Sequence, residues 1–261
     1  MFHYYVGRMI MGRKDYLKDI AQKHTDKMES LYFNEIQKSV LATQVYGDDF
    51  TRGEMPGNKA ECVLEKSYTQ ESVLKHATGK KLAVLNYASY RHAGGGFLNG
   101  AMAQEEAMCH ASFLYNVLRS FPDYYEWNEA HYNMGLYMNR ALYSPDVYFF
   151  DGDGNKYVTV DVITCAAPNR SVMLKDGRFS EEQNECVLRD RIRFIRDICD
   201  FNSVDILIAG AFGCGVFAQR PENVASIFVE LFSDTKVRQV IFAVPPDRNY
   251  EPFERVLKRI G

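Results

Sequence analysis

The chain has 261 residues, enough for one sizeable α/β domain with an added helical segment. It is 46% hydrophobic and 25% charged, which is ordinary for a globular protein, and its formal net charge is −3. This balance provides no strong basic field, so duplex nucleic acid is not an expected partner.

The cysteines and apolar runs bear on the cellular setting. None of the six cysteines forms a CxxC pair, and we find neither a signal peptide nor an apolar run long enough to cross a membrane. The histidines are too scattered for a zinc site. We therefore expect a reduced cytoplasmic or, in a eukaryote, nuclear location, with no metal and no membrane contact.

Helices and strands are predicted in chain order from apolar periodicity and from the Pro and Gly residues that mark turns and loops. Two helices are expected within 13–45, then a loop at 51–58 and a helix that Thr69 caps and that runs to about His76. The remaining predicted elements are a strand at 82–85, a helix at 104–119, strands at 146–150 and 157–166 around a turn at 151–154, a helix at 180–200, a strand at 206–209, a helix at 221–233, a strand at 240–244 and a helix at 250–260.

This alternation of strands and helices predicts a three-layer α/β fold. Residues 1–60 are predicted to be an N-terminal helical extension, and residues 61–261 the core on which it packs. Glycine-rich loops follow two of the predicted strands, which is where such folds bind ligands.

The first loop is Gly94-Gly95-Gly96, and it precedes a helix that begins with Glu105 and Glu106. Glycines permit positive φ and close backbone approach to a ligand. A tight strand-to-helix connection would also explain them, and acids near a helix N-terminus also stabilise its dipole. The proximity of the acid pair to a candidate phosphate loop favours a functional role for both.

The second loop is 210–217, and it contains Gly213, Cys214 and Gly215. Two such loops predict a diphosphate held between them on backbone amides. Phe217 is a candidate for stacking on a ribose or base, with a place in the core as its alternative. Cys214 is a weaker candidate for a nucleophile, because no histidine lies near it in sequence.

One spacing pattern is three glycines, seven further residues and then Gln104-Glu105-Glu106. The pattern resembles the signature of the bacterial-type (microbial) poly(ADP-ribose) glycohydrolases, which have a macrodomain-like core. The similarity continues through 84–89 and 107–109, and it returns at 161–169 and 213–217. One departure is His92-Ala93, where that family commonly has Asn-Pro, which puts one contact to the distal ribose in doubt.

The resemblance implies a three-layer macrodomain-like mixed sheet flanked by helices, and hydrolysis of ribose–ribose O-glycosidic bonds. Glu106 would be the general acid, with Glu105 and Gln104 orienting ribose hydroxyls and no cofactor required. It also implies exo-type release of ADP-ribose. The implied partners are ADP-ribose and poly(ADP-ribose) on modified proteins. Two alternatives stay open: a macrodomain reader that binds ADP-ribose without cutting it, and a mono-ADP-ribosyl hydrolase.

The resemblance places adenine near the last strand and helix, beside Asn249, Tyr250 and Phe253, although Phe253 could equally anchor that helix in the core. The full set of expected substrate-binding residues is Asn86, Ala88, Ser89, Gly94, Gly95, Gly96, Phe97, Gln104, Gly213, Cys214, Gly215, Val216, Phe217, Asn249 and Phe253.

Overall fold

The structure is a computed structural model that describes residues 12–53, 57–152, 154 and 156–260. Its strands are β1 (Gln44–Tyr46), β2 (Glu61–Glu65), β3 (Leu82–Tyr87), β4 (Ala141–Phe150), β5 (Tyr157–Cys165), β6 (Ile206–Ala209) and β7 (Gln239–Ala243). In the described ranges they form one seven-stranded sheet in the order β1-β4-β5-β3-β6-β7-β2. β4 is antiparallel to both β1 and β5, and the other neighbouring strands are parallel. The predicted mixed sheet is therefore confirmed.

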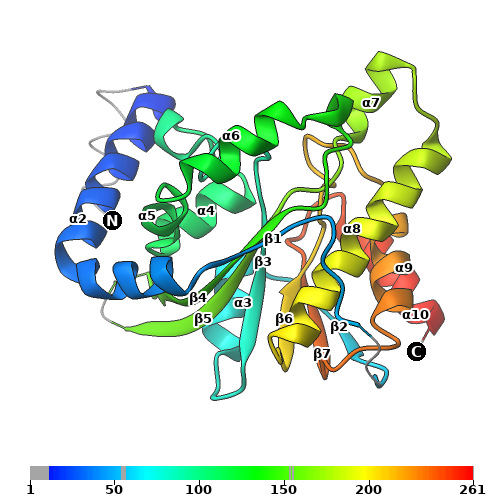
Figure 1. The fold of residues 1–261 in the computed structure, drawn as a ribbon. Coiled ribbons are helices and arrows are strands. Elements are labelled where there is room, and N and C mark those ends of the chain that lie inside the picture. The colour runs from blue at the N-terminus through cyan, green and yellow to red at the C-terminus, as the bar shows by residue number, and fades with distance from the viewer. Residues whose placement is uncertain (1–11, 54–56, 153, 155, 261) are drawn as a thin grey trace.

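Helices cover both faces of the sheet, so the fold has three layers (Figure 1). The helices are α2 (Arg13–Ala42), α3 (Thr69–His76), α4 (Gln104–Ala111), α5 (Leu114–Leu118), α6 (Pro122–Ala130), α7 (Arg170–Asp176), α8 (Glu181–Phe201), α9 (Pro221–Leu231) and α10 (Tyr250–Ile260), with short 3-10 turns η1 (Phe97–Asn99) and η2 (Asn133–Gly135).

Side-chain alternation along the strands divides the core between these two faces. On β3, Ala83 and Leu85 pack in the cluster formed with α8, α9 and α10. Their neighbours Leu82 and Val84 pack in the cluster formed with α2, α3, α4, α5 and α6. Because successive side chains of a strand point to opposite faces, the buried run of β3 supplies both cores at once.

The segment before residue 61 differs in detail from the prediction. The two helices expected within 13–45 are confirmed as two helical segments of α2, because Tyr32 interrupts it with the non-helical angles φ −129° and ψ 29°. β1 follows and pairs with β4 at the edge of the sheet, so this segment also contributes a strand. Residues 1–11 and 54–56 of the expected extension and loop lie outside the described residues. The division at residue 60 stays a prediction.

The predicted helix over 104–119 is wrong in one respect, because it breaks at Ser112. There the backbone is extended, with φ −152° and ψ 177°, and it bridges to Phe149 of β4. The Ser112 hydroxyl donates to Met108 O at 2.7 Å and accepts from Leu114 N at 3.0 Å. Serine side chains that bond to nearby backbone groups in this way compete with helical hydrogen bonds, so α4 ends and α5 begins anew.

Other boundaries also differ. α3 begins at Thr69 itself, so its cap is Tyr68. β4 begins five residues earlier than expected and contains a register shift at Asp146, whose φ is 59°. β1, β2, α6 and α7 were not predicted. The turn at 151–154 is confirmed by Gly154 N donating to Asp151 O, although Asp153 lies outside the described residues. Within the described part of the chain, no helix is both long and apolar enough to cross a membrane.

Candidate active site

The three glycines make the turn that leaves β3. Gly94 and Gly95 have φ of +64° and +61°, a region that side chains other than glycine rarely adopt. A Cβ atom on Gly94 would lie 2.7 Å from the ring of Tyr115, and one on Gly95 would lie 2.6 Å from Oε1 of Glu106. The glycines are therefore required by packing against the following helices, and they bring the backbone against the acid pair.

Glu106 is 7% exposed and lies in the first turn of α4. Its Oε1 accepts the Gly96 amide at 2.8 Å, and its Oε2 accepts the Ala103 amide at 2.8 Å. The Ala103 contact is the carboxylate half of a capping box, which helps to start the helix here. A carboxylate oxygen has two lone pairs, so each oxygen of Glu106 keeps one for a ligand.

Glu105 is more deeply buried, at 4% exposed. Its carboxyl accepts from Asn86 Nδ2 at 3.1 Å and from the Ser89 amide at 2.7 Å. Burial raises the pKa of Glu105 from its ordinary 4.5 to about 8, because the charged form loses its hydration. The charge of Glu106 raises it further, and the donors from Ser89 and Asn86 act in the opposite direction.

The amides of the first loop do not face a ligand, which corrects the expectation that 94–97 forms half of a phosphate cradle. Gly95 donates to His92 O, Phe97 donates to Gly94 O, Gly96 donates to Glu106, and the Gly94 amide acts on Glu105. Every donor of the turn is thus occupied within the chain. The first loop positions the carboxyls and leaves anion binding to another segment.

The second loop has the free donors. The amides of Gly213, Gly215, Val216 and Phe217 donate to no acceptor within the described residues. These residues line a cavity of about 230 Å³, whose lining residues are Tyr87, Ala103, Gln104, Ala167, Ala211, Gly213, Gly215, Val216 and Phe217. Successive unpaired amides around a concave surface are suited to an anion. The expected set of binding residues did not include Tyr87, Ala103, Ala167 or Ala211, although each lies within a segment that the sequence singled out.

Several expected binding residues have other tasks. Gln104 lines the cavity, but its amide donates to Leu85 O at 2.9 Å and accepts from Tyr87 N at 2.9 Å, so it fastens α4 to β3 instead of presenting to ribose. The Ala88 amide donates to Cys165 O. Phe97 is 1% exposed and packs edge-on against His110, so its side chain belongs to the core.

Three more expectations are corrected by burial. Cys214 is 2% exposed and burial raises the pKa of its thiol, which disfavours a nucleophilic thiolate. Phe253 is fully buried against Phe242, so its place is in the core and not on an adenine. Asn249 is nearly buried, and its amide nitrogens bond to Asp247. By contrast, Phe217 lines the cavity and contacts Tyr137.

The comparisons with known proteins agree with this geometry. Residues 14–152, more than half of the chain, match the microbial-type PARG catalytic domain. Poly(ADP-ribose) glycohydrolase (PARG) from Thermomonospora curvata is 28% identical; the match covers 92% of this chain and 98% of that chain, with a TM-score of 0.82. Its complex with the inhibitor ADP-HPD has the same identity and TM-score and is covered over 99% of its length.

A second organism supplies a ligand complex. PARG from Deinococcus radiodurans in complex with ADP-ribose is 29% identical, and the match covers 87% of this chain and 98% of that chain, with a TM-score of 0.79. No curated protein sequence matches the chain. The family match, the mixed sheet and the buried acid pair agree, and the chain belongs to the microbial-type PARG family.

Proposed function

We propose that this protein is a poly(ADP-ribose) glycohydrolase that cleaves ribose–ribose O-glycosidic bonds, with Glu106 as general acid. The observation that carries the proposal is the position of Glu105 and Glu106. Both carboxyls are buried against Gly95, in the loop after β3, and the segment before them lines a cavity in which the amides of Gly213, Gly215, Val216 and Phe217 have no partner within the described residues. A reader that only binds ADP-ribose has no need for two adjacent buried carboxyls.

The acid pair supplies the proton that the reaction needs. Cleavage of the bond between C1″ and the 2′ oxygen passes through an oxocarbenium-like state, and the leaving oxygen must be protonated. With a pKa of about 8, Glu105 holds a proton at neutral pH. A diphosphate bound nearby disfavours further negative charge and so strengthens the hold of Glu105 on its proton.

In the proposed step, Glu106 donates its proton to the leaving 2′ oxygen as the C1″–O bond breaks. The resulting Glu106 carboxylate then accepts a proton from water, whose oxygen bonds to C1″, and the acid is restored. Its amide contacts with Gly96 and Ala103 hold the group in place throughout, and they stabilise the carboxylate once it forms. No other protein group has to change its protonation state.

The ligand is proposed to lie across the end of the sheet. Its diphosphate would accept from the free amides of Gly213, Gly215 and Val216, and Phe217 would contact the distal ribose. Asn86 is fully buried, and its Oδ1 has no partner in the described ranges although its Nδ2 bonds to Glu105. A ribose hydroxyl next to Glu105 would supply the donor that Asn86 lacks.

The deciding experiment offers the protein three substrates in parallel: ADP-ribose polymer, mono-ADP-ribosylated protein and ADP-ribosylated DNA. Free ADP-ribose released from the polymer, with no release by Glu106→Gln, supports the proposal. Binding of polymer without any product would instead identify a reader. Poly(ADP-ribosyl)ated proteins are the proposed source of the polymer, and the cytoplasmic location stays a prediction.

A further inference from the structure

Arg191 of α8 is the largest fully buried side chain of the described residues, at 1% exposed. The recorded partners of its guanidinium are neutral groups, namely oxygens and the Cys165 thiol. Nε bonds to Asn139 Oδ1 at 2.7 Å, one terminal nitrogen bonds to Ala166 O, and the other bonds to Leu136 O at 3.4 Å. A buried cation is normally paired with a carboxylate, because removal of a charge from water is costly.

No Asp or Glu of the described residues lies within ion-pair distance of Arg191. The carboxylate of Asp48, which is exposed, accepts from the backbone amide of Asn139 at 3.4 Å and makes no ion pair with Arg191. The titratable groups that respond to Arg191 are the Tyr90 phenol and the Cys165 thiol, and burial raises the pKa of both, so both stay neutral at neutral pH. The positive charge of Arg191 is therefore not balanced by a carboxylate among the residues that the structure describes.

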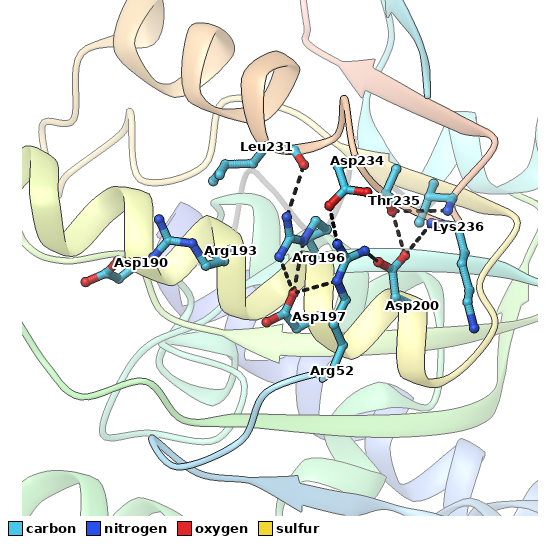
Figure 2. A network of polar contacts seen from close by, with 11 residues as sticks. Arg52, Asp190, Arg193, Arg196, Asp197, Asp200, Leu231, Asp234, Thr235 and Lys236 are labelled. Atoms are coloured by element: carbon cyan, nitrogen blue, oxygen red, sulfur yellow. Dashed lines mark hydrogen bonds and ion pairs between the residues drawn. The ribbon is translucent and has the colours of Figure 1, made fainter. Parts of the chain in front are cut away.

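Arg52 shows the ordinary arrangement in the same molecule. Its side chain is 7% exposed, and its guanidinium lies among the carboxylates of Asp197, Asp200 and Asp234, as Figure 2 shows. Asp197 and Asp200 belong to the C-terminal part of α8, the helix that also carries Arg191. Carboxylates of α8 thus neutralise the charge of Arg52, whereas Arg191 of the same helix has no carboxylate partner among the described residues.

Arg191 binds the backbone of segments that form the wall of the cavity. Ala166, whose carbonyl it binds, directly precedes Ala167 in the wall of the cavity between the acid pair and the second loop. Leu136, its other carbonyl partner, precedes Tyr137, whose ring contacts Phe217 in the same wall. Arg191 therefore binds the two segments that carry Ala167 of the cavity wall and Tyr137, which supports Phe217 of that wall.

We propose that Arg191 is an internal counter-charge for the diphosphate of the ligand. This inference rests on the proposed function. The neutral carbonyls lower the cost of burying the guanidinium but do not neutralise it, and a diphosphate in the cavity completes the balance. The loop amides would hold the anion in place by hydrogen bonds, and Arg191 would attract it by its positive charge. Such a local positive charge matters because the formal net charge of the protein is −3.

The test compares ADP-ribose, which carries two phosphates, with adenosine, which carries none. Calorimetry measures the affinity of ADP-ribose, and competition against it measures that of adenosine. Arg191→Met should weaken ADP-ribose binding about tenfold and change adenosine binding by less than about twofold, because only the charged ligand senses the field. A residue that merely holds the fold would weaken both ligands by the same factor, and that result overturns the proposal.

Arg52→Met is the matched control, because it also removes a buried guanidinium beside α8. It should lower stability and leave the ratio of the two affinities within about twofold of the unaltered protein. A similar change of that ratio in Arg52→Met would show that Arg191 is not special. If the unaltered protein fails to bind ADP-ribose, the proposed function fails first, and the two failures are thus distinguishable.

Arg191→Lys gives an independent arm if the Met variant does not fold. A buried lysine without a carboxylate loses its charge more readily than arginine does. ADP-ribose affinity of Arg191→Lys should therefore approach that of the unaltered protein near pH 6 and fall relative to it by about tenfold near pH 9. An affinity ratio between the two proteins that is constant across this pH range contradicts a role for the charge.

Discussion

Gly95 forms the surface against which Glu106 packs: a Cβ atom at Gly95 would lie 2.6 Å from Oε1 of Glu106 and 2.9 Å from Oε2 of Glu105. The glycine motif and the acid motif are thus one structural unit. The turn needs positive φ at Gly95, and its lack of a side chain leaves room for both carboxyls.

Glu106→Gln should retain ADP-ribose binding and lose turnover by about 10²–10⁴-fold, since the amide cannot donate an acidic proton. Both oxygens of Glu106 accept backbone amides, so the NH₂ of glutamine must face one of these donors. A loss of stability of about 1–3 kcal/mol should accompany the change. Single-turnover assays on polymer, with calorimetry and urea unfolding, measure these effects. A near-normal rate would remove Glu106 from the mechanism.

Stability should depend on pH through Glu105. Its pKa is about 8 in the folded protein against an ordinary 4.5, so between these values the folded state holds a proton that the unfolded state has lost. The contribution of Glu105 to the free energy of unfolding is therefore fully present below about pH 4.5, falls as pH rises, and is lost above pH 8.

Glu105→Gln removes this titration. The stability of the variant relative to the unaltered protein should rise steadily from pH 5 to pH 8.5, whatever the cost of the substitution itself. Urea unfolding across this range measures the difference. Parallel curves for the two proteins would mean that Glu105 does not titrate in this window.

Gly215 offers a cleaner test of the anion site than Gly95. A Cβ atom at Gly215 would meet nothing within 4 Å, whereas one at Gly95 would strain the turn and displace the acids. Gly215→Leu should fold with little change in melting temperature and weaken ADP-ribose binding more than about tenfold by filling the cavity, because bound ligand must then give up contacts. Gly95→Ala should lose stability and turnover together. Unaltered affinity in Gly215→Leu would place the diphosphate elsewhere.

Phe253→Ala should act on stability alone. The ring is fully buried against Phe242, and such truncations cost about 3–5 kcal/mol. The affinity of the folded fraction for ADP-ribose should not change. Calorimetry at a temperature well below the melting point of the variant checks this. A selective loss of affinity for adenosine-containing ligands would return Phe253 to the adenine site.

Digestion of long polymer should release free ADP-ribose from the earliest time points and leave the last protein-linked unit in place. This exo-type action is a proposal that follows from the resemblance of 94–106 to the bacterial-type enzymes. Chromatography of products over the first few per cent of digestion is the measurement. Oligomers among the early products would show internal cleavage. His92-Ala93, beside the first loop, would then be the first residues to replace by Asn-Pro.

Much of the fold was predictable because several of its strands are short apolar runs and several of its helices have clear starts. β3, β5, β6 and β7 follow this rule. β2 was missed because Glu61 and Glu65 flank only three apolar residues, and it becomes a strand by pairing with β7. Apolar periodicity predicted one helix across Ser112. The helix ends there because the Ser112 hydroxyl bonds to Met108 O and competes with the backbone hydrogen bonds of the helix.

The acid pair could be identified from the sequence alone, because Gly94–Gly96 and Glu105–Glu106 are close along the chain and both follow β3. Which amides are free depends on the folded chain, since the donors of the first loop all find acceptors and several of the second loop do not. The tertiary structure also placed Phe253 in the core and left Arg191 buried without a carboxylate among the described residues. These features depend on groups that folding brings together from distant segments, and the local sequence pattern does not predict which groups will meet.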